Sequence, residues 1–199
     1  METDARSATS VLILAGGRGQ RMGGRDKGLI SWRGKPLIQW LCDAARPVTD
    51  DLLISCNRNH DAYAEHADRL VCDDDDTFPG PLAGIRAGLA AARHARLLVL
   101  PCDTPLIDSS LLWAMLHKAL ERPDQPLMLR QRGQLEPLFC VIPNRLAATF
   151  ERSWQQGLRS PRQVLLAQSC ALLDLDDTDP RLANLNDPAL LRRTLPDGT

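Results

Sequence analysis

The stretch VLILAGGRGQRMGGRDKG (residues 11–28) decides how the rest of the chain is organised. It begins with five apolar residues, Val11 to Ala15, and continues as six glycines interleaved with four basic side chains. An apolar run that stops at a pair of glycines is typical of a buried strand that opens into a loop. Glycine lets the backbone approach a ligand closely, successive backbone N–H groups can form an anion-binding hollow, and arginine and lysine add positive charge for phosphate oxygens. The stretch therefore predicts a nucleotide-phosphate site at the carboxyl end of the first strand of an α/β sheet.

Two well-known phosphate-binding patterns do not fit this loop. The P-loop requires Lys-Ser/Thr after its second glycine, but Arg25 and Asp26 follow Gly24. The dinucleotide fingerprint G-x-G-x-x-G fits from Gly17 onward except at its last position, which is Met22. The remaining alternative is a plain surface loop, which four basic residues directly after a buried strand disfavour.

The composition of the chain excludes some classes of function. The 199 residues carry a formal net charge of −1, so the basic excess that nucleic-acid and anionic-membrane binding require is missing. Six cysteines without a C-x-x-C pair predict small, buried, reduced residues in a cytoplasmic protein. The N-terminus lacks the apolar core of a signal peptide, and no apolar run reaches membrane-spanning length. We therefore expect residues 1–8 to be disordered, residues 9–194 to form a single domain with neither a nucleic-acid nor a membrane partner, and residues 195–199 to be a tail.

Apolar runs alternate with helical periodicity along the chain. Strands are expected at residues 10–15, 51–56, 69–72, 96–100, 127–130, 135–142 and 171–175. Helices are expected from Pro36 to the residue before Pro47, at 61–66, 82–93, 109–121 and 144–154, from Ser160-Pro161 onward, and at 187–193. In the helix at 109–121, the residues expected to face the core are Leu111, Leu112, Met115, Leu116 and Leu120. This alternation predicts an α/β fold: a mostly parallel sheet with helices on both faces, and a small antiparallel addition around Arg132-Gly133.

Two aspartates follow predicted strands: Asp73 comes directly after residues 69–72, and Asp103 comes shortly after residues 96–100. Ligands of open α/β sheets bind at the carboxyl ends of strands, and Mg²⁺ binds through one or two carboxylates plus substrate phosphates. Asp103 is therefore either a metal ligand or the cap of its own turn. Asp74 to Asp76 predict a solvated turn. Asn184 and Asn186, before the last predicted helix, either contact a ligand or bond to local backbone groups.

The order of the motifs resembles that of nucleotidyltransferases with a glycine loop and a Rossmann-like fold. The motifs are Leu14-Ala15-Gly16-Gly17, Arg21-Met22-Gly23-Gly24, Asp26-Lys27, Asn57-Arg58, Pro79-Gly80-Pro81-Leu82-Ala83-Gly84, Pro101-Cys102-Asp103-Thr104-Pro105 and Asn184-x-Asn186. As an ordered set, which covers nearly the whole chain, they are similar to the molybdenum cofactor guanylyltransferase family.

The resemblance implies a reaction. GMP would pass from GTP to molybdopterin or molybdenum-molybdopterin, with release of pyrophosphate and formation of a guanine dinucleotide cofactor. Mg²⁺ is the implied metal cofactor. The resemblance also implies transient contacts with molybdenum-insertion proteins and with target molybdoenzymes.

The resemblance further implies roles for single residues. The implied catalytic residues are Arg21, Lys27 and Asp103, of which Asp103 holds Mg²⁺ and the two basic residues offset charge on the departing pyrophosphate. The implied nucleotide contacts are Leu14, Ala15, Gly16, Gly17, Lys27, Ser55, Asn57, Asp73, Gly80, Gly84 and Asp103. Within that set, Ser55 and Asn57 are alternatives for one polar contact at a strand end. Asn184 and Asn186 are implied to lie beside the pterin. The resemblance gives no role to Arg18.

Two rival functions differ from this one in the nucleotide or in the chemistry. The first is a CTP-using enzyme of the same fold, acting on the same pterin or on a sugar-alcohol phosphate. The segment Leu14-Ala15-Gly16-Gly17 disfavours it, because the cytidylyl relatives resemble Leu-Ala-Ala-Gly. The second is a non-catalytic GTP-binding protein that delivers the cofactor, which the presence of Lys27 and Asp103 disfavours.

Overall fold

The computed structural model describes residues 8–16, 26–72 and 80–185, which are organised around one seven-stranded sheet. Across the sheet the strands are β5 (Arg69–Val71), β4 (Leu52–Ser55), β1 (Thr9–Leu14), β6 (Arg96–Pro101), β8 (Gln134–Pro143), β7 (Leu127–Gln131) and β9 (Ala171–Leu175). Within this sheet, β8 alone is antiparallel to its neighbours. The mostly parallel sheet with an antiparallel addition is thus confirmed. Residues 1–8 were expected to be disordered, and 1–7 of these lie outside the described residues, as do the helix expected at 187–193 and the tail at 195–199.

β1 is the centre of the parallel part of the sheet. It pairs with β4 along one side and with β6 along the other. The chain proceeds from β1 to β4 and β5 on one side, then crosses back to place β6 on the other side. This reversal makes the gap between the carboxyl ends of β1 and β6 the topological switch point, which is where ligands of open α/β sheets bind.

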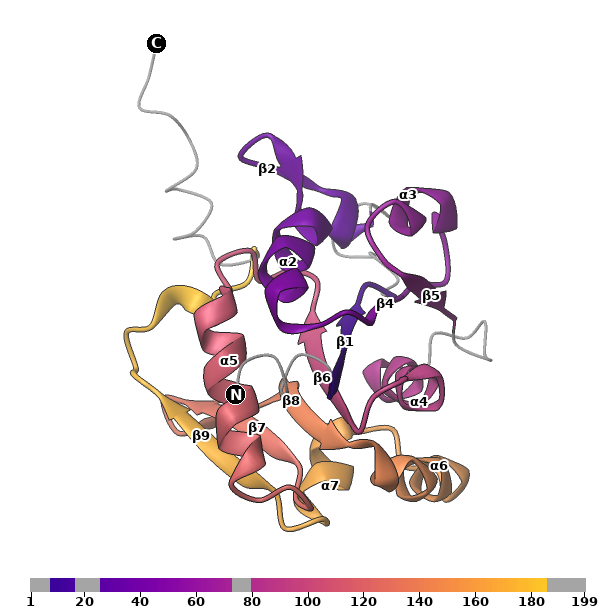
Figure 1. Cartoon of the computed structure of the whole chain (residues 1–199), viewed down its shortest axis with the longest axis vertical. Coiled ribbons are helices and arrows are strands. Elements are labelled where there is room, and N and C mark those ends of the chain that lie inside the picture. The colour runs from indigo at the N-terminus through magenta and orange to yellow at the C-terminus, as the bar shows by residue number, and fades with distance from the viewer. Residues whose placement is uncertain (1–7, 17–25, 73–79, 186–199) are drawn as a thin grey trace.

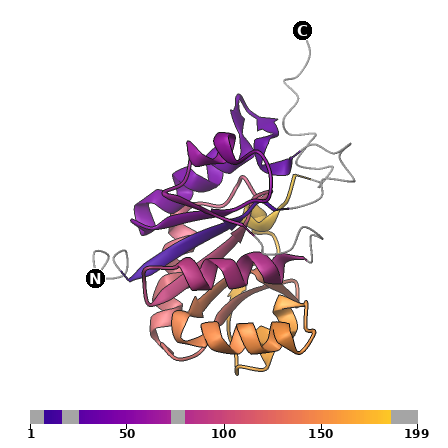
Figure 2. The same cartoon turned by 90° about the vertical axis from the view of Figure 1, so that its right-hand side faces the viewer.

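Helices cover both faces of the sheet (Figure 1). One face carries α2 (Leu37–Ala45) and α5 (Ser109–Leu120), and the other carries α4 (Pro81–Ala91), α6 (Ala147–Gln155) and α7 (Pro161–Leu166). Figure 2 shows α4 and α6 side by side across their face, in agreement with their contacts. The remaining elements are α3 (His60–Ala64), η2 (Lys27–Leu29), η3 (Arg46–Val48), η4 (Asn144–Leu146), η5 (Pro180–Leu182) and the hairpin of β2 (Ser31–Trp32) with β3 (Lys35–Pro36). None of the helices in the described ranges is long and apolar enough to cross a membrane.

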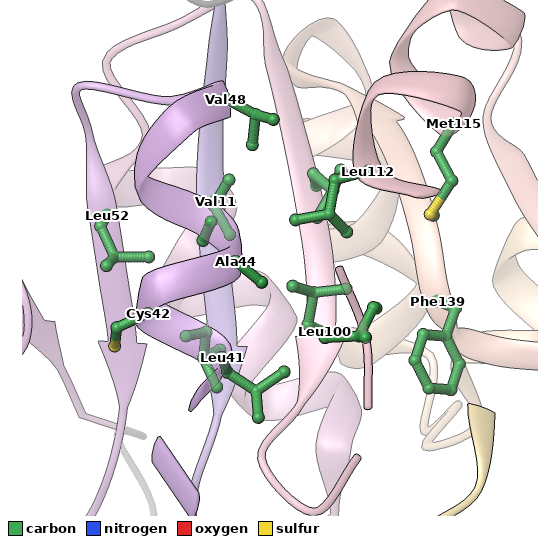
Figure 3. Close-up of a cluster of buried hydrophobic side chains, with 14 of the residues drawn as sticks. Val11, Leu41, Cys42, Ala44, Val48, Leu52, Leu100, Leu112, Met115 and Phe139 are labelled. Carbon is green, nitrogen blue, oxygen red and sulfur yellow. The ribbon is translucent and has the colours of Figure 1, made fainter. Parts of the chain in front are cut away.

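The two helical layers explain why β1 is apolar at consecutive positions. Successive side chains of a strand point to opposite faces, so a strand covered on both faces needs apolar residues throughout. Val11 and Ile13 pack with α2 and α5, whereas Leu12 packs with α4 on the other face. Figure 3 shows part of the apolar cluster between the sheet and the face covered by α2 and α5, to which α2 contributes Leu41 and α5 contributes Leu112.

Three details of the sequence-based expectation were wrong. Pro36 does not begin the helix: it is extended (φ −64°, ψ 149°) and belongs to β3, so α2 begins at Leu37. Leu120 is 45% exposed, because α5 turns Leu116 and Ala119 toward the core and leaves the last residue at the edge. The cysteines were expected to be buried. All six are free and four of them are buried, but Cys72 is exposed.

Asp51 fixes the amino end of the sheet, opposite the switch point. Its fully buried carboxylate accepts hydrogen bonds from the Ser10 hydroxyl (2.6 Å), the Arg93 backbone N–H (3.0 Å) and the Arg69 guanidinium. We expect Asp51→Asn to lower the free energy of unfolding by about 2–3 kcal/mol, because it leaves a guanidinium without its charged partner. Urea denaturation measures this, and a loss below about 1 kcal/mol would contradict the assignment.

The Asp51 anchor also predicts a pH dependence. Burial alone raises the pKa of Asp51, but the hydrogen bonds from Ser10, Arg93 and Arg69 outweigh it and hold this pKa below its ordinary value of 3.8. A carboxyl whose pKa is lowered by folding contributes stability above its unfolded pKa and loses it as the pH falls through the folded pKa. The stability gap between wild type and Asp51→Asn should therefore be constant from about pH 5 to about pH 8 and narrow below about pH 4.

Candidate active site

The carboxyl ends of β1, β4 and β6 meet at one edge of the sheet. The N–H of Ala15 donates to the carbonyl of Ser55 (2.8 Å), and the N–H of Cys102 donates to the carbonyl of Leu14 (3.2 Å). These bonds bring the predicted contact residues Leu14, Ala15 and Ser55 to the same edge as Asp103, which lies two residues after the end of β6. The N–H of Ala15 is used by the sheet, so a ligand near this segment would meet the carbonyl of Ala15 and the backbone of Gly16.

Lys27 and Asp103 face each other across the switch point. The Lys27 ammonium lies 3.1 Å from the Asp103 carboxylate, although 76 positions separate them in the sequence. Their side chains are 33% and 18% exposed, so the pair is partly shielded yet reachable by a ligand. The turn after β6 is closed by the Thr104 hydroxyl, which donates to the carbonyl of Pro101 (3.4 Å). The Asp103 carboxylate, which follows β6, thus contacts a lysine of η2.

The N-terminus of α4 is the third component of this edge. Gly80 precedes the helix with φ 101° and ψ 179°, a conformation that residues with a side chain rarely adopt. Gly84 packs against the ends of β1 and β4: a Cβ there would lie 2.6 Å from the Ser55 hydroxyl oxygen and 2.9 Å from a Leu14 methyl. Helix N-termini present backbone N–H groups and positive partial charge, so this one favours an anion.

Gly84 and Gly88 provide a matched pair for testing the position of the site. A Cβ at Gly88, one turn further along α4, would lie 2.5 Å from a methyl of Leu12 in the core. We expect both Gly84→Ala and Gly88→Ala to cost about 1–3 kcal/mol of stability through overpacking. Only Gly84→Ala should also weaken nucleotide binding, by about tenfold, because it displaces Ser55 and Leu14. Calorimetric titration with Mg²⁺–GTP measures this, and an equal loss of affinity in both variants would contradict it.

Of the other residues predicted to contact a ligand, the structure describes Asn57 and Asn184. Asn57 follows β4 and is half-buried, while Asn184 is exposed. The N–H of Leu185 donates to the carbonyl of Asp103 (2.8 Å), which brings the segment with Asn184 to the same edge as Asp103. Gly17, Arg21, Asp73 and Asn186 lie outside the described residues.

One group of residues beside Lys27 was missed by sequence reasoning. The Asp26 carboxylate, only 5% exposed, accepts hydrogen bonds from the Tyr63 hydroxyl and the Asn59 amide (3.1 Å), and it lies 3.5 Å from the Arg58 guanidinium. A useful signal was available, since Tyr63 is the single tyrosine of the chain and Asp26 directly precedes Lys27. The pairing itself cannot be read from the sequence, because Tyr63 lies 37 positions from Asp26.

The described part of this site can hold charge, and the Cys102 thiol beside Asp103 is not suited to act as a covalent nucleophile. Burial, then the nearby Asp103 and Asp26 carboxylates, raise the pKa of the Cys102 thiol to about 12, so the thiol stays neutral. Within the described ranges no group of three or more His, Cys, Asp or Glu side chains could enclose a metal. A single carboxylate such as Asp103 nevertheless suits Mg²⁺, which is commonly bound by one or two carboxylates together with substrate phosphates.

The chain is similar in sequence to one family of proteins and similar in fold to several solved structures. The profile of the MobA-like NTP transferase domain matches residues 11–171. A molybdenum cofactor guanylyltransferase of Pseudomonas paraeruginosa is 60% identical over 193 residues, which are 97% of this chain and 98% of that protein. Among solved structures, molybdopterin-guanine dinucleotide biosynthesis protein A from Archaeoglobus fulgidus has a TM-score of 0.72 at 22% identity, covering 93% of this chain and 96% of its own. A 2-C-methyl-D-erythritol 4-phosphate cytidylyltransferase from Thermus thermophilus has a TM-score of 0.69 at 16% identity, covering 94% and 97% respectively, and supports the fold alone.

Proposed function

This chain belongs to the MobA-like NTP transferase family and is a nucleotidyltransferase, and we propose that it transfers GMP from GTP to molybdenum-molybdopterin with release of pyrophosphate. The observation that carries the proposal is the Lys27–Asp103 pair (3.1 Å) at the switch point between β1 and β6. The pair would supply a cation for phosphate oxygens and a carboxylate for a metal at the edge where ligands of open α/β sheets bind. The name of the 60% identical relative supports guanine as the base and molybdopterin as the acceptor.

The proposed reaction needs positioning and charge neutralisation. An oxygen of the pterin's terminal phosphate bonds to the α-phosphorus of GTP, and the bond from that phosphorus to the pyrophosphate oxygen breaks. The attacking oxygen is already anionic at neutral pH, so no strong base is needed. Lys27 binds phosphate oxygens of GTP and offsets the negative charge that collects on the pyrophosphate as it leaves. The backbone at Ala15 and Gly16 and the N-terminus of α4 hold the nucleotide in line.

Asp103 is the residue that would hold Mg²⁺, with phosphate oxygens of the nucleotide as further ligands. When bound there, the metal supplies charge neutralisation on the phosphates. For Lys27 this means a change of partner, because the ammonium that now contacts Asp103 would turn to the phosphates. Arg21, outside the described residues, is the second cation that we assign to the leaving pyrophosphate.

Further residues of the site would contact the guanine nucleotide and the pterin. Gly80 and Gly84 would shape the pocket for guanine, with Ser55 or Asn57 as a polar contact and Gly17 and Asp73 as further nucleotide contacts. Asn184 and Asn186 would contact the pterin. We place the reaction in the cytoplasm, with transient contacts to molybdenum-insertion proteins and to the molybdoenzymes that receive the product.

Pyrophosphate release with each nucleotide tests this function. Purified protein with Mg²⁺ and molybdopterin should release pyrophosphate from GTP and not from CTP. Release from CTP alone would establish the CTP-using enzyme instead. Stabilisation by Mg²⁺–GTP in a melting experiment, without any pyrophosphate release, would identify a GTP-binding delivery protein, because a ligand that binds only the folded state raises its stability.

A further inference from the structure

Adjacent residues of one short segment are directed to opposite sides of the site. Asp26 points to α3 and the residues before it, where Tyr63, Asn59 and Arg58 surround its carboxylate. The next residue, Lys27, points to the carboxyl end of β6, where its ammonium contacts Asp103. Asp26 is extended (φ −75°, ψ 119°), and this conformation sends consecutive side chains to opposite sides. We call Asp26 with Arg58, Asn59 and Tyr63 the Asp26 clamp.

The clamp also determines how the backbone on either side of Lys27 is packed. Lys27 to Leu29 form a single 3-10 turn, closed by the N–H of Leu29 donating to the carbonyl of Asp26 (3.2 Å). Gly28 lies directly on Tyr63: a Cβ there would be 2.5 Å from the phenol oxygen. Tyr63 is fully buried, and its pKa is raised by burial and by the hydrogen bond to Asp26, so it remains a hydrogen-bond donor at any physiological pH. The turn that carries Lys27 is therefore held on both sides of that residue.

We propose that Asp26 is a positioning residue of the transferase: the Asp26 clamp fixes the backbone of Lys27, so that its ammonium stays directed at the phosphate subsite when Asp103 is engaged elsewhere. The proposal rests on the phosphate-binding role that we propose for Lys27. In the structure, the Asp103 carboxylate contacts the tip of the lysine side chain. Once Asp103 is occupied by a metal, that contact is lost, and within the described residues the clamp is what still fixes the base of this side chain.

Purely structural stabilisation is the competing explanation, and a double-mutant cycle separates the two. Asp26→Asn removes the charge at nearly constant shape, and Tyr63→Phe removes one donor while it keeps the ring. Each is made in the wild type and in Lys27→Ala, and kcat and KM for GMP transfer are measured. We expect either variant to lower kcat by about 10- to 100-fold when Lys27 is present, and by less than about threefold when it is absent.

Asp51→Asn is the matched control for the cycle. Asp51 is also a buried carboxylate with three hydrogen-bond donors, but it lies at the amino end of the sheet. It should lower the melting temperature at least as much as Asp26→Asn, yet change kcat by less than about threefold at a temperature where each variant is folded. Equal losses of kcat for Asp26→Asn with and without Lys27, an unchanged kcat in Asp26→Asn and Tyr63→Phe, or a matching loss in Asp51→Asn would each overturn the proposal.

Binding of inorganic tripolyphosphate keeps this inference distinct from the proposed function. It needs the phosphate subsite but neither guanine nor pterin. We expect Asp26→Asn to weaken this binding, measured by calorimetry, about tenfold with Lys27 present and not in the Lys27→Ala background. This result would support the clamp even if the wild type transfers no GMP, which would refute only the proposed function. Equal weakening in both backgrounds, or none in either, would overturn the clamp.

Discussion

Asp103→Ala is expected to abolish Mg²⁺-dependent pyrophosphate release from GTP in the presence of molybdopterin, with a loss of at least about a thousandfold in kcat. The change removes the carboxylate proposed to hold the metal and leaves no replacement at the end of β6 within the described residues. Initial rates of pyrophosphate release over a range of Mg²⁺ concentrations measure the effect.

Two comparisons make the Asp103 result interpretable. Asp103→Asn keeps the shape of the side chain and removes only its charge, so it should lose nearly as much activity. Asp174→Ala removes an exposed carboxylate that pairs with Arg130 on the neighbouring strand of the sheet, and it should leave the rate unchanged. The melting temperature should differ little among the three, because partly exposed ion pairs contribute little to stability. Unchanged turnover in Asp103→Ala would remove this residue from the mechanism.

Lys27→Ala is expected to cost about 2–4 kcal/mol of transition-state stabilisation, or about 30- to 900-fold in kcat/KM. The ammonium is the positive charge that the structure places opposite Asp103, and alanine cannot bind the departing pyrophosphate. Lys118→Ala removes a lysine that pairs with Glu121 on the surface of α5, and it serves as the control without effect. Lys27→Arg should recover part of the loss, because it restores the charge with a different geometry. A loss below tenfold would contradict the role of Lys27.

The sequence was most informative where burial is greatest. β1 and β6 are covered on both faces, so their apolar runs are uninterrupted and their positions were predicted to within one residue. Asp108 lies one residue before the helix expected at 109–121 and caps α5, with its carboxylate accepting from the N–H of Leu111 (2.9 Å). Because the carboxyl ends of parallel strands share one edge, the convergence of Leu14, Ser55 and Asp103 followed from the strand assignments.

The sequence was less informative where distant residues decide the outcome. Pro36 was expected to start a helix, yet the N–H of Leu37 bonds to the carbonyl of Ile30 and keeps Pro36 in a hairpin. The Asp26–Tyr63 pair depends on how α3 packs beside η2, which no local pattern encodes. At Asp103 the sequence left a metal ligand and a turn cap open, and it did not indicate that the carboxylate pairs with Lys27, 76 positions away.

The fate of the α- and γ-phosphates of GTP distinguishes GMP transfer from hydrolysis and from transfer of the γ-phosphate. GTP labelled separately at the α- and γ-phosphates is incubated with enzyme, Mg²⁺ and molybdopterin in a single turnover, and the products are separated. We expect the α-label to move to the pterin dinucleotide while the γ-label leaves as pyrophosphate in equal amount, and we expect Asp103→Ala to give neither product. Equal release of γ-label as pyrophosphate without molybdopterin, or transfer of the γ-label to the acceptor, would contradict GMP transfer to molybdopterin.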